Sequence, residues 1–212
     1  MTTLTVATGR PTLADHVFSR SLATDAVLIA AGAGLTAIAA HVVVPLYPVP
    51  ITGQTAAVLI VGATLGATRG ALSMVLYAAL GLFLPVYSEG THGIAVLLGQ
   101  TGGYIVGFVF AAALTGYLAQ RRWEHRLLGG LASFLAGTVV TFAFGLPWLA
   151  LSLGLDLQQT LQSGLYPFLV GGLVKAVFAA AVMRLAWLGV TRSDADRPVV
   201  DRSDADPTSD AV

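Results

Sequence analysis

The sequence contains no cysteine, and only 10% of its 212 residues are charged. The lack of cysteine excludes disulfide bonds and thiolate chemistry. The scarcity of charge excludes an ordinary soluble domain, in which about 25% of the residues are charged. Hydrophobic residues make up 56% of the chain, and they form long runs rather than ten-residue alternating segments. The chain is therefore predicted to be an all-α integral membrane protein.

The motifs of common catalytic and nucleotide sites are also missing. There is no Gly-rich loop of the GxxxxGK[ST] type, so the chain itself is not expected to hydrolyse ATP. The four histidines lie far apart along the chain, which argues against a metal site. Ser88 and His92 share a Gly-rich loop, a poor setting for a nucleophile and its base. No acid is expected inside the membrane, which argues against a proton-coupled pump. We predict a non-enzymatic protein without catalytic residues, metal, cofactor or nucleic-acid partner.

The apolar runs predict six transmembrane helices. They cover about residues 25–44, 52–66, 70–84, 98–119, 127–152 and 164–190. The run 55–84 is too long for one span but long enough for two short ones, so a tight turn is expected at 66–70. The segment Gly145-Leu-Pro147 is expected to kink or end the fifth helix. Thr24 or Asp25 is expected to cap the first helix.

The charges outside the apolar runs indicate the topology. Within the six-helix arrangement the arginines fall on one side, at Arg69, Arg121, Arg122, Arg126, Arg184 and Arg192. By the positive-inside rule, both termini are cytoplasmic and the outward loops are 45–53, 85–97 and 153–163. The chain thus divides into a cytoplasmic N-terminal segment, 1–24, a transmembrane domain, 25–190, and an acidic tail, 191–212. The tail has no aromatic residue and is expected to be disordered.

Lys175 is the only lysine of the chain and lies near the middle of the last apolar run. A lysine at this depth costs at least ~2.5 kcal/mol on insertion scales and usually faces a cavity or a partner. No acid lies within two helical turns of it along the chain, and Gly171 and Gly172 remove side chains one turn earlier. A ligand carboxylate would compensate the charge. Alternatively, the long side chain reaches a headgroup region.

Two loop segments have two interpretations each. Segment 45–50 holds three prolines and is either a rigid lid or a plain turn. Segment 99–107 holds four glycines, which permit either close helix packing or a backbone that lines a cavity. In the second case Gln100, Thr101 and Tyr104 would add hydrogen-bonding groups at the outer end.

The first predicted helix carries small residues at a spacing of four, namely Ala26, Ala30 and Gly34. Such a face lets two membrane helices approach closely. Its partner is either another protein or the helices of the same bundle.

Four motifs along residues 22–190 resemble one known family when they are taken together. They are Pro50-Ile-Thr-Gly-Gln-Thr55, Gly81-Leu-Phe-Leu-Pro-Val86, Leu98-Gly-Gln-Thr-Gly-Gly-Tyr104 and Tyr166-Pro-Phe…Gly-Leu-Val-Lys175. In order and spacing they look like the BioY family, the biotin-binding S subunits of energy-coupling-factor (ECF) transporters. The chain departs from the family pattern at Gly172, where many members have Asp, and at Gln100, where many have Pro.

The resemblance implies a six-helix ECF S-component bundle in a prokaryotic cell membrane, with a biotin pocket near the outer face. The substrate-binding residues that it implies or that the chain suggests are Lys175, Gln54, Tyr87, Thr101, Tyr104 and Gly172. It also implies a mobile loop between the first two helices. A further implication is docking, through Ala26, Ala30 and Gly34, on a transmembrane T subunit that carries two ATPase subunits. The alternatives are a solitary biotin transporter that works without an ATPase, and a non-transport membrane bundle.

Overall fold

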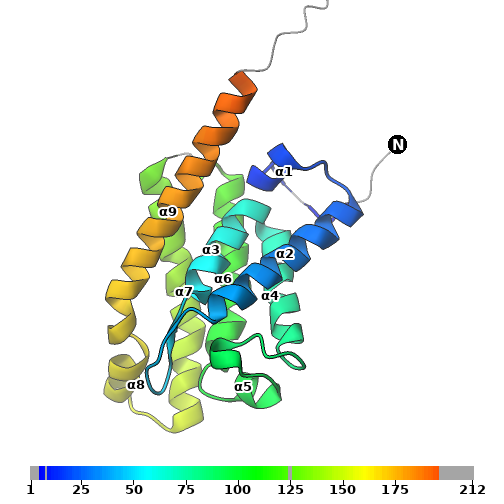
Figure 1. The fold of residues 1–212 in the computed structure, drawn as a ribbon. Helices are drawn as coiled ribbons and strands as arrows, with labels where there is room; N and C mark the ends of the chain where they lie inside the picture. Colours follow the sequence, from blue (N-terminus) through cyan, green and yellow to red (C-terminus); the bar gives the residue numbers. More distant parts are fainter. Residues whose placement is uncertain (1–4, 8, 124–125, 196–212) are drawn as a thin grey trace, which may run out of the picture.

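The computed structural model describes residues 5–7, 9–123 and 126–195, and these form a helical bundle (Figure 1). Four helices are apolar and long enough to cross a membrane: α2 (Leu22–Ala40), α6 (Gly102–Gln120), α7 (Leu127–Leu153) and α9 (Tyr166–Ala195). Two apolar helices are shorter, α3 (Gln54–Leu65) and α4 (Ala67–Leu80). The predicted arrangement of six membrane helices is confirmed in outline, as four long and two short helices.

Short elements occupy segments that were expected to be loops. The N-terminal segment contains α1 (Leu13–Val17), and the loop after α4 contains the 3-10 helix η1 (Ser88–Gly90) and α5 (Ile94–Leu98). The polar segment before α9 forms α8 (Leu157–Gly164) because Asp156 and Gln159 make reciprocal capping bonds at its start. Two short antiparallel strands, β1 (Val43–Val44) and β2 (Ile51–Thr52), pair Val43 with Thr52.

Several predicted helix ends are wrong. Ser21 caps α2 by accepting a hydrogen bond from the Thr24 amide, so Thr24 and Asp25 lie inside the first turn. Of the two alternatives for Gly145-Leu-Pro147, an end of the helix is wrong, because α7 continues through Pro147 to Leu153, next to its predicted end at 152.

The C-terminal prediction is corrected in part. Helix α9 extends to Ala195, so the expected disordered tail does not begin at 191. Residues 196–212 lie outside the described part of the chain.

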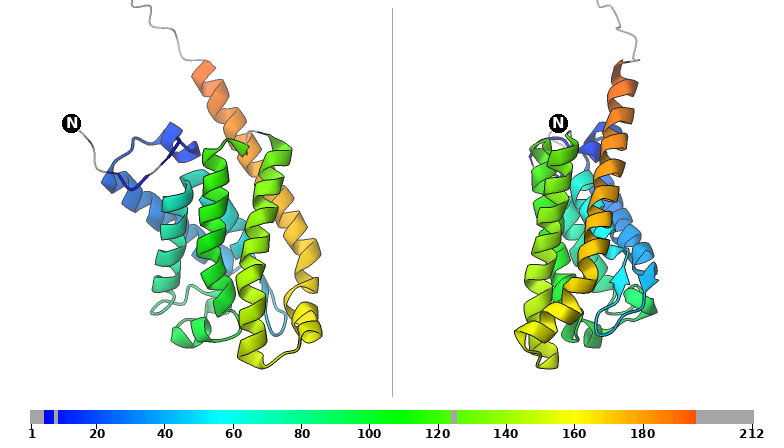
Figure 2. Two further views of the ribbon diagram at one scale, coloured as in Figure 1. Left: turned by 180° about the vertical axis from the view of Figure 1, so that it is seen from behind. Right: turned by 90° about the vertical axis from the view of Figure 1, so that its left-hand side faces the viewer.

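The break between α3 and α4 lies at one residue, Gly66, whose φ of +88° favours glycine. Helix α6 packs directly against this break. A Cβ atom on Gly116 would lie 2.3 Å from the carbonyl carbon of Gly66, and one on Gly62 would lie 2.2 Å from the Thr115 hydroxyl. The backbones of the two short helices therefore pack directly against α6, with no side chain between them at these glycines. Helix α6 forms the centre of the bundle, with α7 and α9 beyond it (Figure 2).

Arg69, which was predicted to mark a cytoplasmic turn, lies inside α4 and is 1% exposed. Its guanidinium donates to Asp15 at 2.8 Å and to Asp25 at 2.7 Å. Both carboxylates are buried, and Arg20 also pairs with Asp15 at 2.9 Å. The expectation of no acid within the membrane helices is therefore wrong for Asp25. The cluster joins α1, α2 and α4 at one end of the bundle.

Candidate functional site

A cavity of about 360 Å³ lies at the end of the bundle opposite α1 (Figure 1). Its walls come from the hairpin before α3, the start of α3, the loop that contains η1, α5 with the α5–α6 turn, the first half of α6, the middle of α7 and the start of α9. All three loops that were predicted to face outward lie at this end (Figure 1). A volume of this order is within the range of pockets for small organic ligands.

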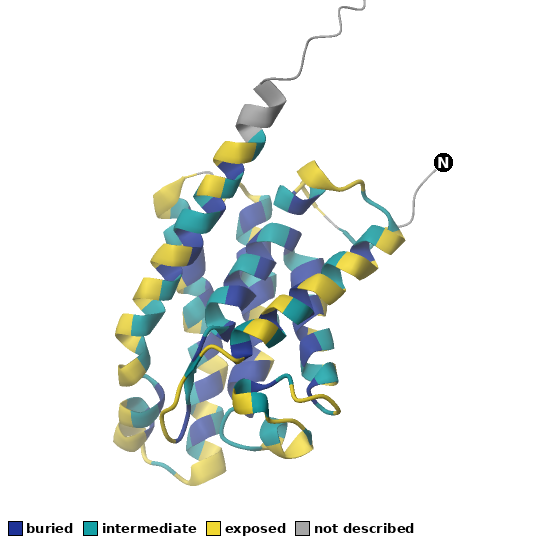
Figure 3. Ribbon diagram, viewed as in Figure 1, coloured by how far each residue is buried: buried dark blue, intermediate teal, exposed yellow. Residues whose placement is uncertain are grey.

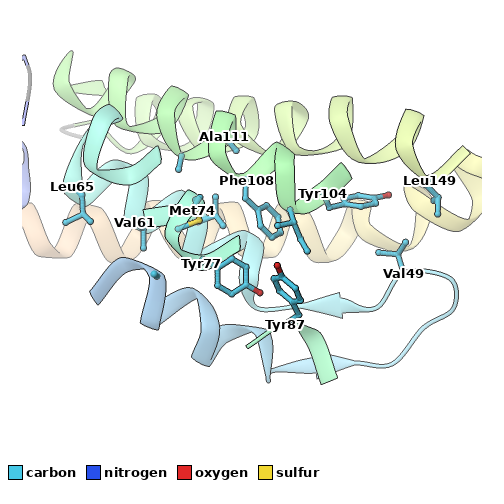
Figure 4. Packing of buried hydrophobic residues seen from close by; sticks show 14 of the residues in the cluster. Val49, Val61, Leu65, Met74, Tyr77, Tyr87, Tyr104, Phe108, Ala111 and Leu149 are labelled. Atoms are coloured by element: carbon cyan, nitrogen blue, oxygen red, sulfur yellow. The ribbon is translucent and has the colours of Figure 1, made fainter. Parts of the chain in front are cut away.

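The cavity wall combines aromatic and aliphatic surface with nine polar or charged residues, namely Thr52, Gln54, Thr55, Ser88, Glu89, Thr91, Gln100, Thr101 and Thr141. The rings are those of Tyr87, Tyr104, Phe108, Phe142 and Phe168. Figure 4 shows the side chains of Tyr87, Phe108 and Tyr104 close to one another in the buried cluster. Both tyrosine hydroxyls are already engaged, because Tyr87 donates to the Ala78 carbonyl at 2.6 Å and Tyr104 to the Gly164 carbonyl at 3.1 Å. These two residues therefore offer mainly ring surface to a ligand.

Gln54 lies on the wall with its side-chain amide fixed by neighbours. Its oxygen accepts a 2.7 Å hydrogen bond from the Thr52 hydroxyl, and its nitrogen donates to the Tyr77 hydroxyl. Tyr77 in turn donates to the Val86 carbonyl at 3.1 Å. An amide nitrogen carries two hydrogens, so one donor of Gln54 is left for a ligand. This chain of hydrogen bonds ties the hairpin to α4 and to the loop after it.

Lys175 lies half-buried in α9, and its ammonium donates to the backbone carbonyl of Thr52. Thr52 is part of the cavity wall, whereas Lys175 is one layer behind it. An ammonium has three donors, and this contact uses one. Among the described residues, no carboxylate forms an ion pair with Lys175. A carbonyl bond leaves its positive charge without a neutralising partner.

The other predicted site residues divide into two groups. Gln54, Tyr87, Thr101 and Tyr104 are brought together on the cavity wall. Gly172 lies outside the wall, and a Cβ atom there would meet only the Thr138 side chain, at 3.8 Å.

Several wall residues were missed by the sequence reasoning. Phe108 lies one turn after Tyr104 on the same helix face, so helical spacing would have found it. Val49 and Pro50 come from the proline segment, and Phe142 and Phe168 come from helices whose relative rotation is set only by packing. Ser88 also lines the cavity, and within the described structure its buried hydroxyl has no hydrogen-bond partner.

The small-residue face of α2 points away from the bundle. Ala26 and Ala30 are exposed, and a Cβ atom on Gly34 would meet nothing within 4 Å. The face that packs inward holds other residues, among them Gly32, Ala33 and Thr36. Figure 3 shows the outer surface of α2 as exposed along much of its length. The alternative that Ala26, Ala30 and Gly34 serve packing within this bundle is therefore wrong.

Comparisons with known proteins agree on one family. The sequence model of the BioY family matches residues 10–192. The chain is 38% identical over 150 residues to the biotin transporter BioY of Rhizobium etli, which covers 67% of this chain and 80% of that one. It is 36% identical over 169 residues to the biotin transporter BioY of Thermotoga maritima, covering 78% and 98% of the two chains. Among solved structures, the S-component for biotin from an ECF-type ABC transporter superposes with a TM-score of 0.72 at 26% identity, over 78% of this chain and 92% of that one.

Proposed function

This chain belongs to the BioY family of membrane transporters, which are not enzymes, and from that premise we propose that it captures biotin from outside the cell. As a multi-pass membrane protein it would hold biotin in the cavity opposite α1. The single observation that carries this proposal is the cavity itself: a chamber with five aromatic rings and several polar groups on its wall, next to a half-buried lysine. The similar proteins of Rhizobium etli and Thermotoga maritima are both named biotin transporter BioY, which supports this ligand.

The chemistry of biotin fits the groups on and behind the wall. Its fused rings and aliphatic chain are apolar and suit the aromatic surface of Tyr104, Phe108 and Phe142. Its ureido group donates and accepts hydrogen bonds, which the free donor of Gln54 and the Ser88 hydroxyl can match. Thr101 is a further polar group on the wall.

Lys175 is proposed to bind the ligand in one of two poses. In the first, its ammonium pairs with the biotin carboxylate, which compensates a buried charge that otherwise has only the Thr52 carbonyl. In the second, it donates to the ureido carbonyl, and the carboxylate points outward to water. Gly172 supplies no side chain in either pose, so it would act only by leaving space.

Delivery into the cell is proposed to need partners, because this chain has no nucleotide-binding motif. The outward face formed by Ala26, Ala30 and Gly34 would dock on a transmembrane T subunit that carries two ATPase subunits. The termini would be cytoplasmic, so the cavity would open to the outside, as the arginine distribution favours. The alternative is a solitary transporter that works without an ATPase.

Native mass spectrometry of the purified full chain tests the ligand. We expect a species heavier than the protein by the mass of one biotin. A biotin-depleted preparation should lack this species and regain it when biotin is added. Excess biotin should not add further mass. A depleted preparation that binds no added biotin would contradict the proposed ligand. Biotin uptake in cells with and without the T and ATPase subunits then separates the ECF subunit from the solitary transporter.

A further inference from the structure

The hairpin loop, residues 45–50, closes one side of the cavity. Val49 and Pro50 are part of the wall, and Val49 is 5% exposed. Tyr47, at the tip, points the other way and is 84% exposed. The loop thus has one face in the binding chamber and one in the surroundings, as a cover would have.

The backbone of this loop has few ways to hold its position. Pro45, Pro48 and Pro50 have no amide hydrogen. Strand pairing fixes only the base of the hairpin, where Val43 faces Thr52 and Val44 faces Ile51. Within the described residues, one hydrogen bond reaches the backbone of residues 45–50: the side-chain amide of Gln100 donates to the Pro48 carbonyl.

Gln100 stands on a segment that is itself fixed. It lies in the turn between α5 and α6, where the Gly102 amide donates to the Gly99 carbonyl at 3.1 Å. The indole of Trp148 on α7 donates to the same carbonyl at 2.9 Å. Gln100 is therefore attached to the rigid part of the bundle, while its amide holds the part of the hairpin that has no other hydrogen bond.

We infer that Gln100 is a positioning residue for the ligand site: its amide fastens the hairpin loop over the cavity and so sets how fast ligand enters and leaves. The inference rests on the proposed function for the identity of the ligand. The apolar packing of Val49 keeps the loop against the cavity but is not directional. The hydrogen bond at Pro48 is directional, so it fixes the position of the loop relative to the α5–α6 turn. Lys175 holds the base of the same hairpin, through its hydrogen bond to the Thr52 carbonyl.

The test is Gln100→Met, which removes the donor and keeps the approximate length of the side chain. Gln158→Met is the matched control, because Gln158 is exposed on α8, outside the cavity. A spin label on Tyr47→Cys reports loop motion, and it labels one site only because the chain has no cysteine. With full-length protein in nanodiscs, we expect Gln100→Met to increase the mobile component of the spin-label spectrum. We also expect it to raise the association and dissociation rates of biotin, each roughly 2- to 13-fold, which is the effect of losing one ordinary hydrogen bond. Gln158→Met should change none of the three.

Two results would overturn the inference. Unchanged label mobility would show that the hydrogen bond does not hold the loop. Faster dissociation at an unchanged association rate would show that Gln100 touches the ligand directly instead of holding a cover. If Gln100→Met does not fold, Gln100→Asn, one methylene shorter, gives the same comparison. If the wild type does not bind biotin, the proposed function fails, while the mobility of the label still decides whether Gln100 holds the loop.

Discussion

Lys175 is the residue at which the two proposed poses make opposite predictions. If its ammonium pairs with the ligand carboxylate, biotin amide should bind the wild type more weakly than biotin by about 2–5 kcal/mol, the range for removing one partner of a buried charge pair. Lys175→Met should then lose most of its affinity for biotin and little for the amide. Equilibrium binding of both ligands to both proteins measures the difference. Equal binding of biotin and its amide to the wild type would contradict the carboxylate pose, and wild-type affinity in Lys175→Met would remove the lysine from the site.

Arg69 should be among the most sensitive residues for stability. Replacing it with Met leaves the buried carboxylate of Asp25 without a cation and leaves Asp15 with Arg20 alone. Breaking a buried pair on one side costs about 3–5 kcal/mol. We expect a large drop in the unfolding free energy of the purified protein, measured with a denaturant in detergent.

The matched control for this experiment is Arg10→Met, because Arg10 is exposed and has no ion pair within the described residues. A triple variant in which Asp15 and Asp25 are also changed to Asn should recover much of the lost stability. A triple variant as unstable as Arg69→Met would show that packing, not uncompensated charge, is responsible.

At the scale of elements, the contact between α6 and the α3–α4 break depends on two glycines, Gly116 and Gly62, which have no side chain. In Gly116→Ala the new methyl group would overlap the backbone at Gly66, so we expect a loss of about 1–3 kcal/mol from overpacking. Gly171→Ala is the control within α9, where a Cβ atom meets nothing within 4 Å. It should be neutral or stabilising by up to about 1 kcal/mol, because alanine favours helix. Similar unfolding free energies for the two variants would contradict this account of the packing.

Helix α2 allows docking to be separated from binding. Ala30→Trp places a large ring on the outward face, where it would keep a partner helix at a distance without touching the cavity. We expect biotin uptake in cells that supply the partner subunits to fall to background, with biotin binding to the purified protein unchanged. Ala143→Trp on the exposed side of α7 should leave both intact. Uptake at the wild-type rate in Ala30→Trp would exclude this face as the docking surface.

The elements also show what the sequence could and could not predict. Long apolar runs identified the membrane helices, because length and hydropathy alone decide which segments cross a bilayer. Of the site residues named from the sequence, four do lie together on the cavity wall, and three of them, Gln54, Thr101 and Tyr104, belong to the motifs. The Arg69–Asp25 contact was missed, since it joins residues 44 positions apart. The wall residues Phe142 and Phe168 were missed because helix rotation depends on packing, which no local pattern encodes.

For the whole molecule, the charge cluster predicts how stability depends on pH. Burial would raise the pKa of the Asp15 carboxyl, but hydrogen bonds from Arg20, the Thr12 amide and Arg69, with the charge of Arg69, lower it from 3.8 to about 2. A carboxyl with a lowered pKa in the folded state stabilises the fold above its ordinary pKa and loses that effect as the pH falls. The stability difference between wild type and Asp15→Asn should therefore be constant above about pH 4 and shrink between about pH 4 and 2. A difference that stays constant down to pH 2 would contradict the lowered pKa.

The shortness of two helices makes the two flanks of the molecule unequal in height. Helices α3 and α4 have 12 and 14 residues, so they rise only about 18 and 21 Å, against a hydrocarbon core of about 30 Å. Helix α4 lies with the inclined α2 on one flank, and α9 lies on the other (Figure 2). Lipids beside α4 must thin locally to cover it, at a cost of fractions of a kcal/mol per Å of mismatch. The acyl-chain length of the surrounding lipids therefore contributes to the free energy of the folded protein in the bilayer. A change in membrane thickness can thus alter its stability without any molecule binding at a specific site.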